Sequence, residues 1–316
     1  MLINKELGIK YPIFLGAMAR ITDARFASVI SNAGGLGVIA SGDMTKDEVK
    51  KEIDLIRTLT SKPFGVNIML QSPYSDDIVD LIIEEKVPIV IFGAGSPVKY
   101  MDRLNEANVK VFAVVSSTSF AKRLYKYNPF GFIVEGTESG GHVGFESTLP
   151  LIQVFKKEFP NARIIAAGGF ATGESLNAAL MMGCQGIQMG TRFLASEEAN
   201  VDIKYKEAII NSRDNKTTLT GLKFGLPVRV IKNEMSTNYH KIEKDATSIL
   251  DLELLTVGSL KKAISGDVIN GSLMAGEISS VISEIKPVKK IFEDIILEAK
   301  EANKKYLSLM DEINNI

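Results

Sequence analysis

The first two thirds of the chain alternate between short apolar runs and longer segments in which apolar residues recur every three or four positions. Segments 44–60 and 74–86 have this helical spacing and predict amphipathic helices. The runs are apolar at consecutive rather than alternate positions, so we expect strands buried on both faces, as parallel sheets require. The eight predicted strands lie within residues 11–17, 35–41, 64–70, 88–94, 109–115, 130–136, 163–169 and 186–192.

Eight strand-then-helix units in about 200 residues favour a closed (β/α)8 barrel, the TIM-barrel fold, over an open doubly wound sheet. Residues 198–283 then show several short helical segments and no further run of strand quality. A segment that starts at Pro287 predicts a long amphipathic helix packed against the barrel. We therefore predict an α/β protein. Residues 1–197 and about 287–316 form the barrel, and residues 198–286 form a smaller, mostly helical second domain.

Composition excludes several classes of function. The 37 Lys and Arg residues nearly balance the 38 Asp and Glu residues, so we expect no nucleic-acid partner and no anionic membrane partner. No window approaches the roughly 18 apolar residues that span a bilayer, and the N-terminus lacks a signal-peptide run, which predicts a cytoplasmic protein. One cysteine, Cys184, and two histidines at distant positions predict neither a disulfide nor a metal site.

In a parallel barrel, functional groups lie at the carboxyl ends of the strands. Glycine loops after the seventh and eighth strands stand where such barrels often hold a phosphate, although either loop alone is equally consistent with a tight turn. Thr191 adds a hydroxyl there. The strand-end positions that we predict to bind a ligand are Ala17, Met18, Asn67, Glu135, Gly140, Gly141, Gly168, Gly169, Met189, Gly190 and Thr191.

Two polar side chains at these strand ends have both structural and functional interpretations. Asn67 ends an apolar strand, so its amide either fixes a neighbouring segment or meets the polar edge of a planar ligand. His142 follows the sixth strand, and a lone histidine is often structural. Its position beside Gly140 and Gly141, on the face predicted to hold a phosphate, makes it our candidate catalytic residue.

Four segments carry a family resemblance: EGTESGGHVG (135–144), AAGGFATG (166–173), QMGTRF (188–193) and KPFGVNIML (62–70). They resemble the superfamily of the nitronate monooxygenases and the flavin-dependent enoyl-acyl-carrier-protein reductases II of bacterial fatty-acid synthesis. The segments FGLPVRVIKN and GDVINGSLMAGEIS, at 224–233 and 266–279, look more like the reductase branch. The chain departs from that branch at Arg20, where a tryptophan is usual, and at Ser116, where a proline is usual.

The resemblance implies a barrel that binds FMN at its carboxyl face, beneath a substrate-binding cap. Ala17, Met18 and Asn67 would contact the flavin, the two late glycine loops would hold its phosphate, and Gly140, Gly141 and His142 would lie beside the ring. The reductase branch also implies NADH or NADPH as co-substrate, an acyl-carrier-protein-linked enoyl substrate and a homodimer. Arg20 and Ser116 would then affect substrate or nicotinamide preference.

Three activities follow as alternatives. In a reductase, His142 would donate a hydrogen bond or a proton to the enolate of a trans-2-enoyl thioester. In a nitronate monooxygenase, the same imidazole would remove the acidic proton next to a nitro group. A barrel enzyme without redox chemistry that binds a phosphate ligand is the third alternative, because fold does not determine activity.

Overall fold

Eight parallel strands form one nearly closed sheet in the computed structural model, which describes residues 3–314. Each strand lies within one of the apolar runs that predicted it, so the barrel prediction is confirmed. The strands are β1 (Ile13–Leu15), β2 (Gly37–Ala40), β3 (Phe64–Met69), β4 (Ile89–Gly93), β5 (Lys110–Val115), β6 (Gly131–Glu135), β8 (Ile164–Ala167) and β9 (Gly186–Met189).

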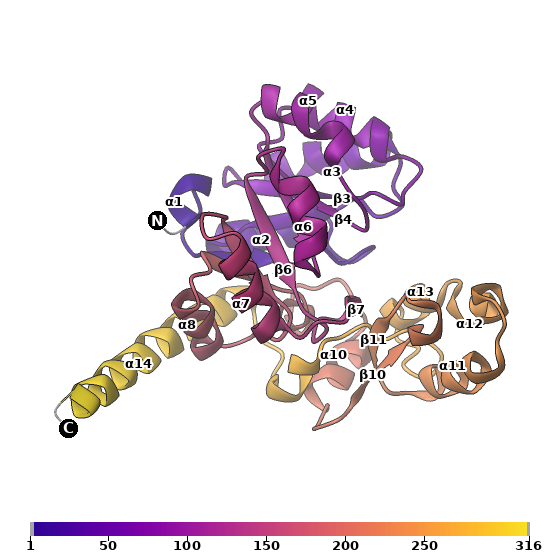
Figure 1. Cartoon of the computed structure of the whole chain (residues 1–316). Coiled ribbons are helices and arrows are strands. Elements are labelled where there is room, and N and C mark those ends of the chain that lie inside the picture. Colours follow the sequence, from indigo (N-terminus) through magenta and orange to yellow (C-terminus); the bar gives the residue numbers. More distant parts are fainter. Residues whose placement is uncertain (1–2, 315–316) are drawn as a thin grey trace.

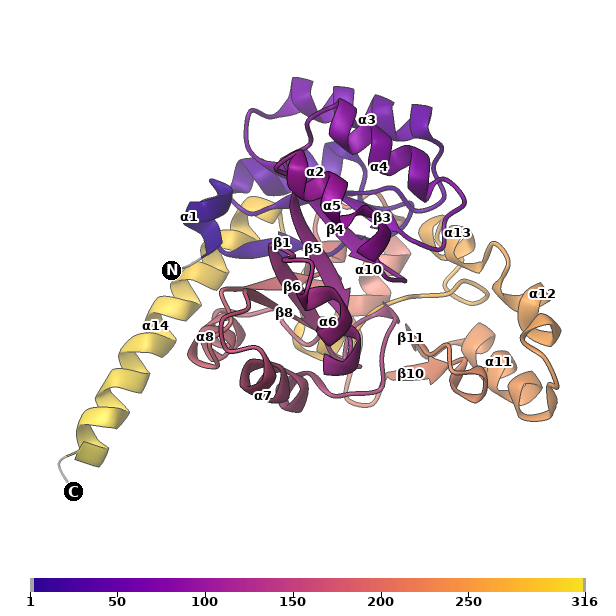
Figure 2. The same cartoon turned by 45° about the horizontal axis from the view of Figure 1, so that its top comes forward.

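The order of the strands around the sheet is β1-β9-β8-β6-β5-β4-β3-β2. A parallel bridge between Phe14 and Leu36 brings the two ends of this series together. Figure 1 and Figure 2 show the strands with the helices outside them. All eight carboxyl ends therefore meet on one face of the molecule.

Side chains alternate between the barrel interior and the surrounding helices. Along β4, Ile89 and Ile91 belong to the interior cluster, whereas Val90 and Phe92 belong to the cluster beneath the helices. Both sets are buried, which is why the strands are apolar at consecutive positions. The short helix α1 (Ile3–Leu7) contributes to the interior cluster and covers its amino-terminal end.

The outer helices begin at polar side chains that accept their first N–H groups. Thr45 and Glu48 form a reciprocal capping box at the start of α3, and Asp23 accepts the N–H of Phe26 at 2.8 Å in α2. These caps fix where each helix leaves the preceding loop. The outer helices are α2 (Ala24–Ala33), α3 (Lys46–Leu59), α4 (Ser75–Glu84), α5 (Met101–Glu106), α6 (Thr118–Tyr125), α7 (Thr148–Glu158) and α8 (Gly173–Met181).

A cap formed by residues 198–286 lies on one side of the barrel and contains short strands beside its helices, although the sequence shows no run of strand quality there (Figure 2). Strands β10 (Thr217–Thr220) and β11 (Val228–Ile231) form an antiparallel sheet whose third strand is β7 (Gly141–His142). The cap strands are four residues long and pair with a distant segment, so local apolar pattern does not reveal them. The main cap helices are α10 (Ile203–Ile210), α11 (Glu234–Asp245), α12 (Glu253–Thr256) and α13 (Ser259–Ile264).

The last helix, α14 (Val288–Asn314), packs against the barrel over only part of its length. Its first half contacts α2 and α8, as predicted, whereas its second half projects away from the body (Figure 1). Although α14 has 27 residues, charged side chains recur along it. Among the described residues, no helix is both long enough and apolar enough to cross a membrane.

Candidate functional site

A cavity of about 300 Å³ opens at the carboxyl face of the barrel, between the strand ends and the cap. It brings together every residue that the sequence predicted at the site, from all parts of the barrel. The predicted residues that line it are Ala17, Met18, Asn67, Glu135, Gly140, Gly141, His142, Gly168, Gly169, Met189, Gly190 and Thr191. The geometry therefore brings these residues together at one site.

Glycine is required where the chain turns from β8 toward the cavity. Gly168 and Gly169 have φ values of +91° and +85°, which side chains of other residues rarely allow. A Cβ atom at Gly168 would also lie 2.9 Å from Oγ1 of Thr148 and 3.1 Å from the carbonyl oxygen of Gly136. At Gly168 and Gly169 the loop after β8 therefore presents main chain to the cavity.

His142 lies on β7, the two-residue strand that the cap sheet recruits from the loop after β6. Val228 is its partner in the register, and Arg229 is the partner of Gly141. The imidazole is exposed to the cavity, with protein atoms around much of the ring. This partial desolvation lowers the pKa of His142 below its ordinary value, so the imidazole is neutral at pH 7. The backbone pairing fixes the direction in which it points.

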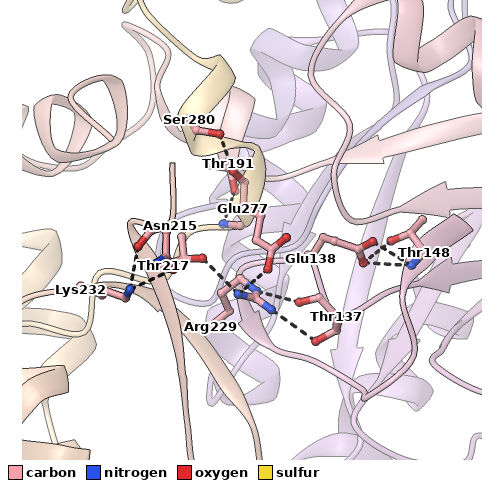
Figure 3. A network of polar contacts seen from close by, with 11 residues as sticks. Thr137, Glu138, Thr148, Thr191, Asn215, Thr217, Arg229, Lys232, Glu277 and Ser280 are labelled. Carbon is pink, nitrogen blue, oxygen red and sulfur yellow. Dashed lines mark hydrogen bonds and ion pairs between the residues drawn. The ribbon is translucent and has the colours of Figure 1, made fainter. Parts of the chain in front are cut away.

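Arg229 holds the segment before His142 against the cap (Figure 3). Its Nε donates to the carbonyl oxygen of Thr137 at 2.7 Å, and one terminal nitrogen donates to Oγ1 of Thr217 at 3.1 Å. The guanidinium also pairs with Glu277 at 2.8 Å. The Arg229 side chain is only 7% exposed, so its bonds to Thr137 and Thr217 are shielded from water, whereas the Glu277 carboxylate is half exposed. A buried cation thus joins the cap to the loop from Thr137 to His142.

A second set of bonds fixes the same loop on the barrel side (Figure 3). Thr148 donates its hydroxyl to the Glu138 carboxylate at 2.7 Å and its N–H at 3.0 Å. The N–H of Glu277 donates to the carbonyl oxygen of Glu138 at 2.9 Å. Thr191, predicted as a ligand group, accepts the N–H of Gly276 at 2.9 Å and keeps its hydroxyl hydrogen for another acceptor.

Two polar groups at strand ends face the cavity. Asn67 donates from Nδ2 to the carbonyl oxygen of Ile91 at 3.1 Å, so it fixes the neighbouring strand while lining the cavity. Burial away from solvent raises the pKa of Glu135 to about 7. At neutral pH this carboxyl is protonated in a large fraction of molecules. No group of three or more His, Cys, Asp or Glu side chains within residues 3–314 is arranged to bind a metal ion.

Comparison with known proteins shows the family to which this chain belongs. The family model described as nitronate monooxygenase matches residues 2–80 and 74–298. The chain belongs to the nitronate monooxygenase family. It is therefore an oxidoreductase, and the alternative of a barrel without redox chemistry is not supported.

Relatives in this family carry several names. A carboxyl-CoA dehydrogenase of Mycobacterium tuberculosis (strain ATCC 25618 / H37Rv), which acts on a hydroxy-methyl-oxo-octahydroindene, is 28% identical over 94% of this chain and 95% of its own. A probable nitronate monooxygenase of Staphylococcus aureus (strain JH9) is 29% identical over 93% of this chain and 96% of its own. FabK from Thermotoga maritima is 43% identical over 97% of this chain and 98% of its own, with a TM-score of 0.92.

Several lining residues escaped sequence prediction, and some of them come from the cap. The hydroxyl of Tyr205 on α10 donates to the carbonyl oxygen of Met274 at 2.9 Å, which ties two cap segments together beside the cavity. Leu260 and Ile278 add apolar surface. These residues lie in short helices and loops without strand-end position or glycine spacing, so no local signal distinguishes them from ordinary core residues.

The two departures from the reductase pattern, Arg20 and Ser116, make their contacts outside the cavity. Arg20 is exposed and pairs with Asp43. Ser116 packs against the loop after β7. A Cβ atom at Gly144 in that loop would lie 2.4 Å from the Cβ atom of Ser116. Neither is among the described residues that line the cavity, so their effect on substrate preference would be indirect.

Proposed function

We propose that this chain is an FMN-dependent reductase that uses NADH or NADPH to reduce trans-2-enoyl thioesters carried on acyl carrier protein. The observation that supports it most is the likeness to FabK, an enoyl-acyl-carrier-protein reductase II, at 43% identity over 97% of the chain. The two relatives with other names described above are 28–29% identical over similar lengths.

The residues at the cavity fit FMN. Gly140 and Gly141 carry no side chains next to His142, and a Cβ atom at Gly140 would lie 2.7 Å from backbone atoms of Ala275 and Gly276. Gly140 therefore lets the loop pack closely on the cap, and neither glycine places a side chain in the cavity that both line. The loops at Gly168 and Gly190 offer main chain that a phosphate can approach closely. When bound, FMN supplies hydride transfer, and the protein supplies position and electrostatics.

His142 has the position and protonation state to stabilise an enolate. Hydride addition to the β-carbon of an enoyl thioester places negative charge on the thioester oxygen. A neutral imidazole donates an N–H hydrogen bond to that oxygen, and the pairing of His142 with Val228 keeps it oriented. Glu135 is partly protonated at pH 7, so it adds less negative charge than an ordinary carboxylate would.

The cap side of the cavity favours an apolar substrate chain. Leu260, Met274 and Ile278 line it, and Met274 is held by the hydroxyl of Tyr205. Contact with an acyl chain would remove these side chains from water, which favours binding of an apolar substrate. A small charged nitronate would bury little apolar surface against them.

Nitronate monooxygenase activity is the second candidate, because two observations favour it. The family model and a curated relative carry that name. In addition, the lowered pKa of His142 leaves its imidazole free to accept a proton from the carbon next to a nitro group.

One experiment separates the two candidates. The purified protein, loaded with FMN, is mixed without air with NADH until the visible flavin absorbance is bleached, and crotonyl thioester is then added. The reductase predicts rapid return of the absorbance and formation of butyryl thioester. A parallel vessel receives propionate 3-nitronate in air, without NADH. Oxygen uptake in that vessel, with no butyryl product in the first, would refute our proposal.

A further inference from the structure

The segment that carries His142 is a loop, residues 137–146, whose two ends are joined. The N–H of Thr137 donates to the carbonyl oxygen of Glu146 at 2.8 Å, which closes the loop between the end of β6 and the start of α7. The residues just outside this bond are packed together, since a Cβ atom at Gly136 would lie 2.1 Å from Oγ1 of Thr148. We call the junction of these four residues the neck of the loop.

Thr148 is buried in this neck and is surrounded by acceptors. Its hydroxyl oxygen lies 2.7 Å from the Glu138 carboxylate, 3.1 Å from the carbonyl oxygen of Gly168 and 3.4 Å from that of Ala167. A hydroxyl has one hydrogen to donate, and the carboxylate is both the nearest and the strongest of these acceptors. Thr148 is not among the described residues that line the cavity, so it acts on the site only through its neighbours.

Glu138 joins the loop to both parts of the molecule (Figure 3). Ser147 precedes α7, but its side chain makes no capping bond. The Glu138 carboxylate accepts the N–H of Thr148 at 3.0 Å instead, and a negative charge is favourable at the start of a helix. The carbonyl oxygen of Glu138 accepts the N–H of Glu277 at 2.9 Å. Its side chain is therefore bonded to the barrel and its main chain to the cap.

We propose that Thr148 is a positioning residue for His142, because its hydroxyl holds the neck of the loop to the barrel. Pairing with β11 fixes the middle of the loop relative to the cap, whereas the neck fixes the loop relative to the strand ends. Without the hydroxyl, the Glu138 carboxylate loses the shorter of its bonds to α7. The loop is then free to shift with the cap, and the imidazole shifts with it.

The test removes the hydroxyl and keeps the shape of the side chain. Thr148→Val leaves the N–H bond to Glu138 in place, whereas Thr148→Ser keeps the hydroxyl and loses only a methyl group. The matched control is Thr118→Val. Thr118 begins the preceding helix α6 and donates its hydroxyl to the Glu158 carboxylate at 3.2 Å, in an exposed bond. Thermal unfolding shows whether each variant is folded, and Thr148→Ala replaces Thr148→Val if the valine variant is not.

The imidazole reports its own position, because the chain has only two histidines, His142 and His240. NMR of the full-length, histidine-labelled protein gives ring signals for both, and His142→Ala assigns them. In the wild type, desolvation holds the pKa of His142 below its ordinary value. We expect Thr148→Val to raise this pKa toward that of a solvated imidazole, since the loop shifts. Thr148→Ser and Thr118→Val are expected to titrate as the wild type does.

Turnover gives a second measurement, and its meaning rests on the function proposed above. At saturating crotonyl thioester, Thr148→Val is expected to reoxidise reduced FMN about tenfold more slowly than the wild type, with KM within about twofold, and Thr148→Ser to recover most of the rate.

An unchanged pKa of His142 in folded Thr148→Val would overturn the proposal. An equal change in Thr118→Val would overturn it as well, and so would a Thr148→Ser variant that titrates like Thr148→Val. If the pKa changes as expected but the wild type does not turn over crotonyl thioester, the positioning role stands and the reductase proposal fails.

Discussion

Replacing Arg229 by alanine tests whether the cap holds the loop from Thr137 to His142 in place. The change removes a charged hydrogen bond to Thr137 and an ion pair with Glu277. A buried hydrogen bond from a charged donor contributes about 2 kcal/mol, and an ion pair with a half-exposed carboxylate adds about 1 kcal/mol or less. We therefore expect the free energy of unfolding to fall by about 3 kcal/mol. For a chain of 316 residues this lowers Tm by about 5 °C.

The effect on the site follows from the same bonds. If half of that energy keeps the loop from Thr137 to His142 in its observed position, FMN affinity falls about tenfold, since 1.4 kcal/mol corresponds to a factor of ten. Fluorescence titration of the apoprotein with FMN measures the affinity, and calorimetry measures Tm. Arg229→Lys keeps the charge but can donate to fewer acceptors. We therefore expect its Tm and its FMN affinity to lie between those of the wild type and those of Arg229→Ala.

A neighbouring lysine provides the matched control. Lys232, on the segment that follows β11, is exposed and donates to the carbonyl oxygen of Asn215 at 2.7 Å (Figure 3). Lys232→Ala is expected to change stability by less than about 0.5 kcal/mol and to leave FMN affinity unchanged. Our reasoning is refuted if Arg229→Ala and Lys232→Ala have equal effects, or if Arg229→Ala binds FMN as tightly as the wild type.

Three further predictions concern the cavity itself. His142→Ala should lower turnover of crotonyl thioester by about 100-fold or more while FMN affinity stays within a few-fold, as stopped-flow measurement of flavin reoxidation can check. Glu135→Gln should flatten the pH dependence of stability: the folded chain keeps this proton up to about pH 7, whereas an unfolded glutamate releases it near 4.5. Wild-type stability should therefore fall by about 3 kcal/mol between these pH values relative to the variant, measured as Tm of the apoprotein. Gly140→Ala, whose Cβ would lie 2.7 Å from Ala275, should displace the loop and abolish FMN binding, detected by equilibrium dialysis.

The barrel could be predicted from the sequence because each strand carries its own signal. In β4, successive residues from Ile89 to Phe92 are buried, alternately by the interior and by the helices, and this leaves an uninterrupted apolar run. The position of the site followed from the same pattern, because parallel strands gather their carboxyl ends. The glycines after β8 and β9 and the side chain of His142 could therefore be assigned to one face from the sequence alone.

The cap could not be predicted in the same way. Strand β10 reads TTLT with three half-buried residues, and β11 includes the buried charge of Arg229, so neither resembles a core strand. The third strand, β7, begins at the second of two glycines and lies more than 80 residues before its partner β11 in the chain. Pairing over that distance depends on tertiary structure, and so do the positions of Tyr205 and Leu260 at the cavity.

The recruitment of His142 into the cap sheet also limits how the protein can be recombined. Residues 198–286 form a continuous stretch of sequence, which makes them look exchangeable with the same stretch of a relative. A transplanted cap would have to supply an edge strand that accepts Gly141 and His142 in the same register, and a cation at the position of Arg229. A chimera that ignores the loop from Thr137 to His142 would exchange the substrate wall and misalign the imidazole at the same time.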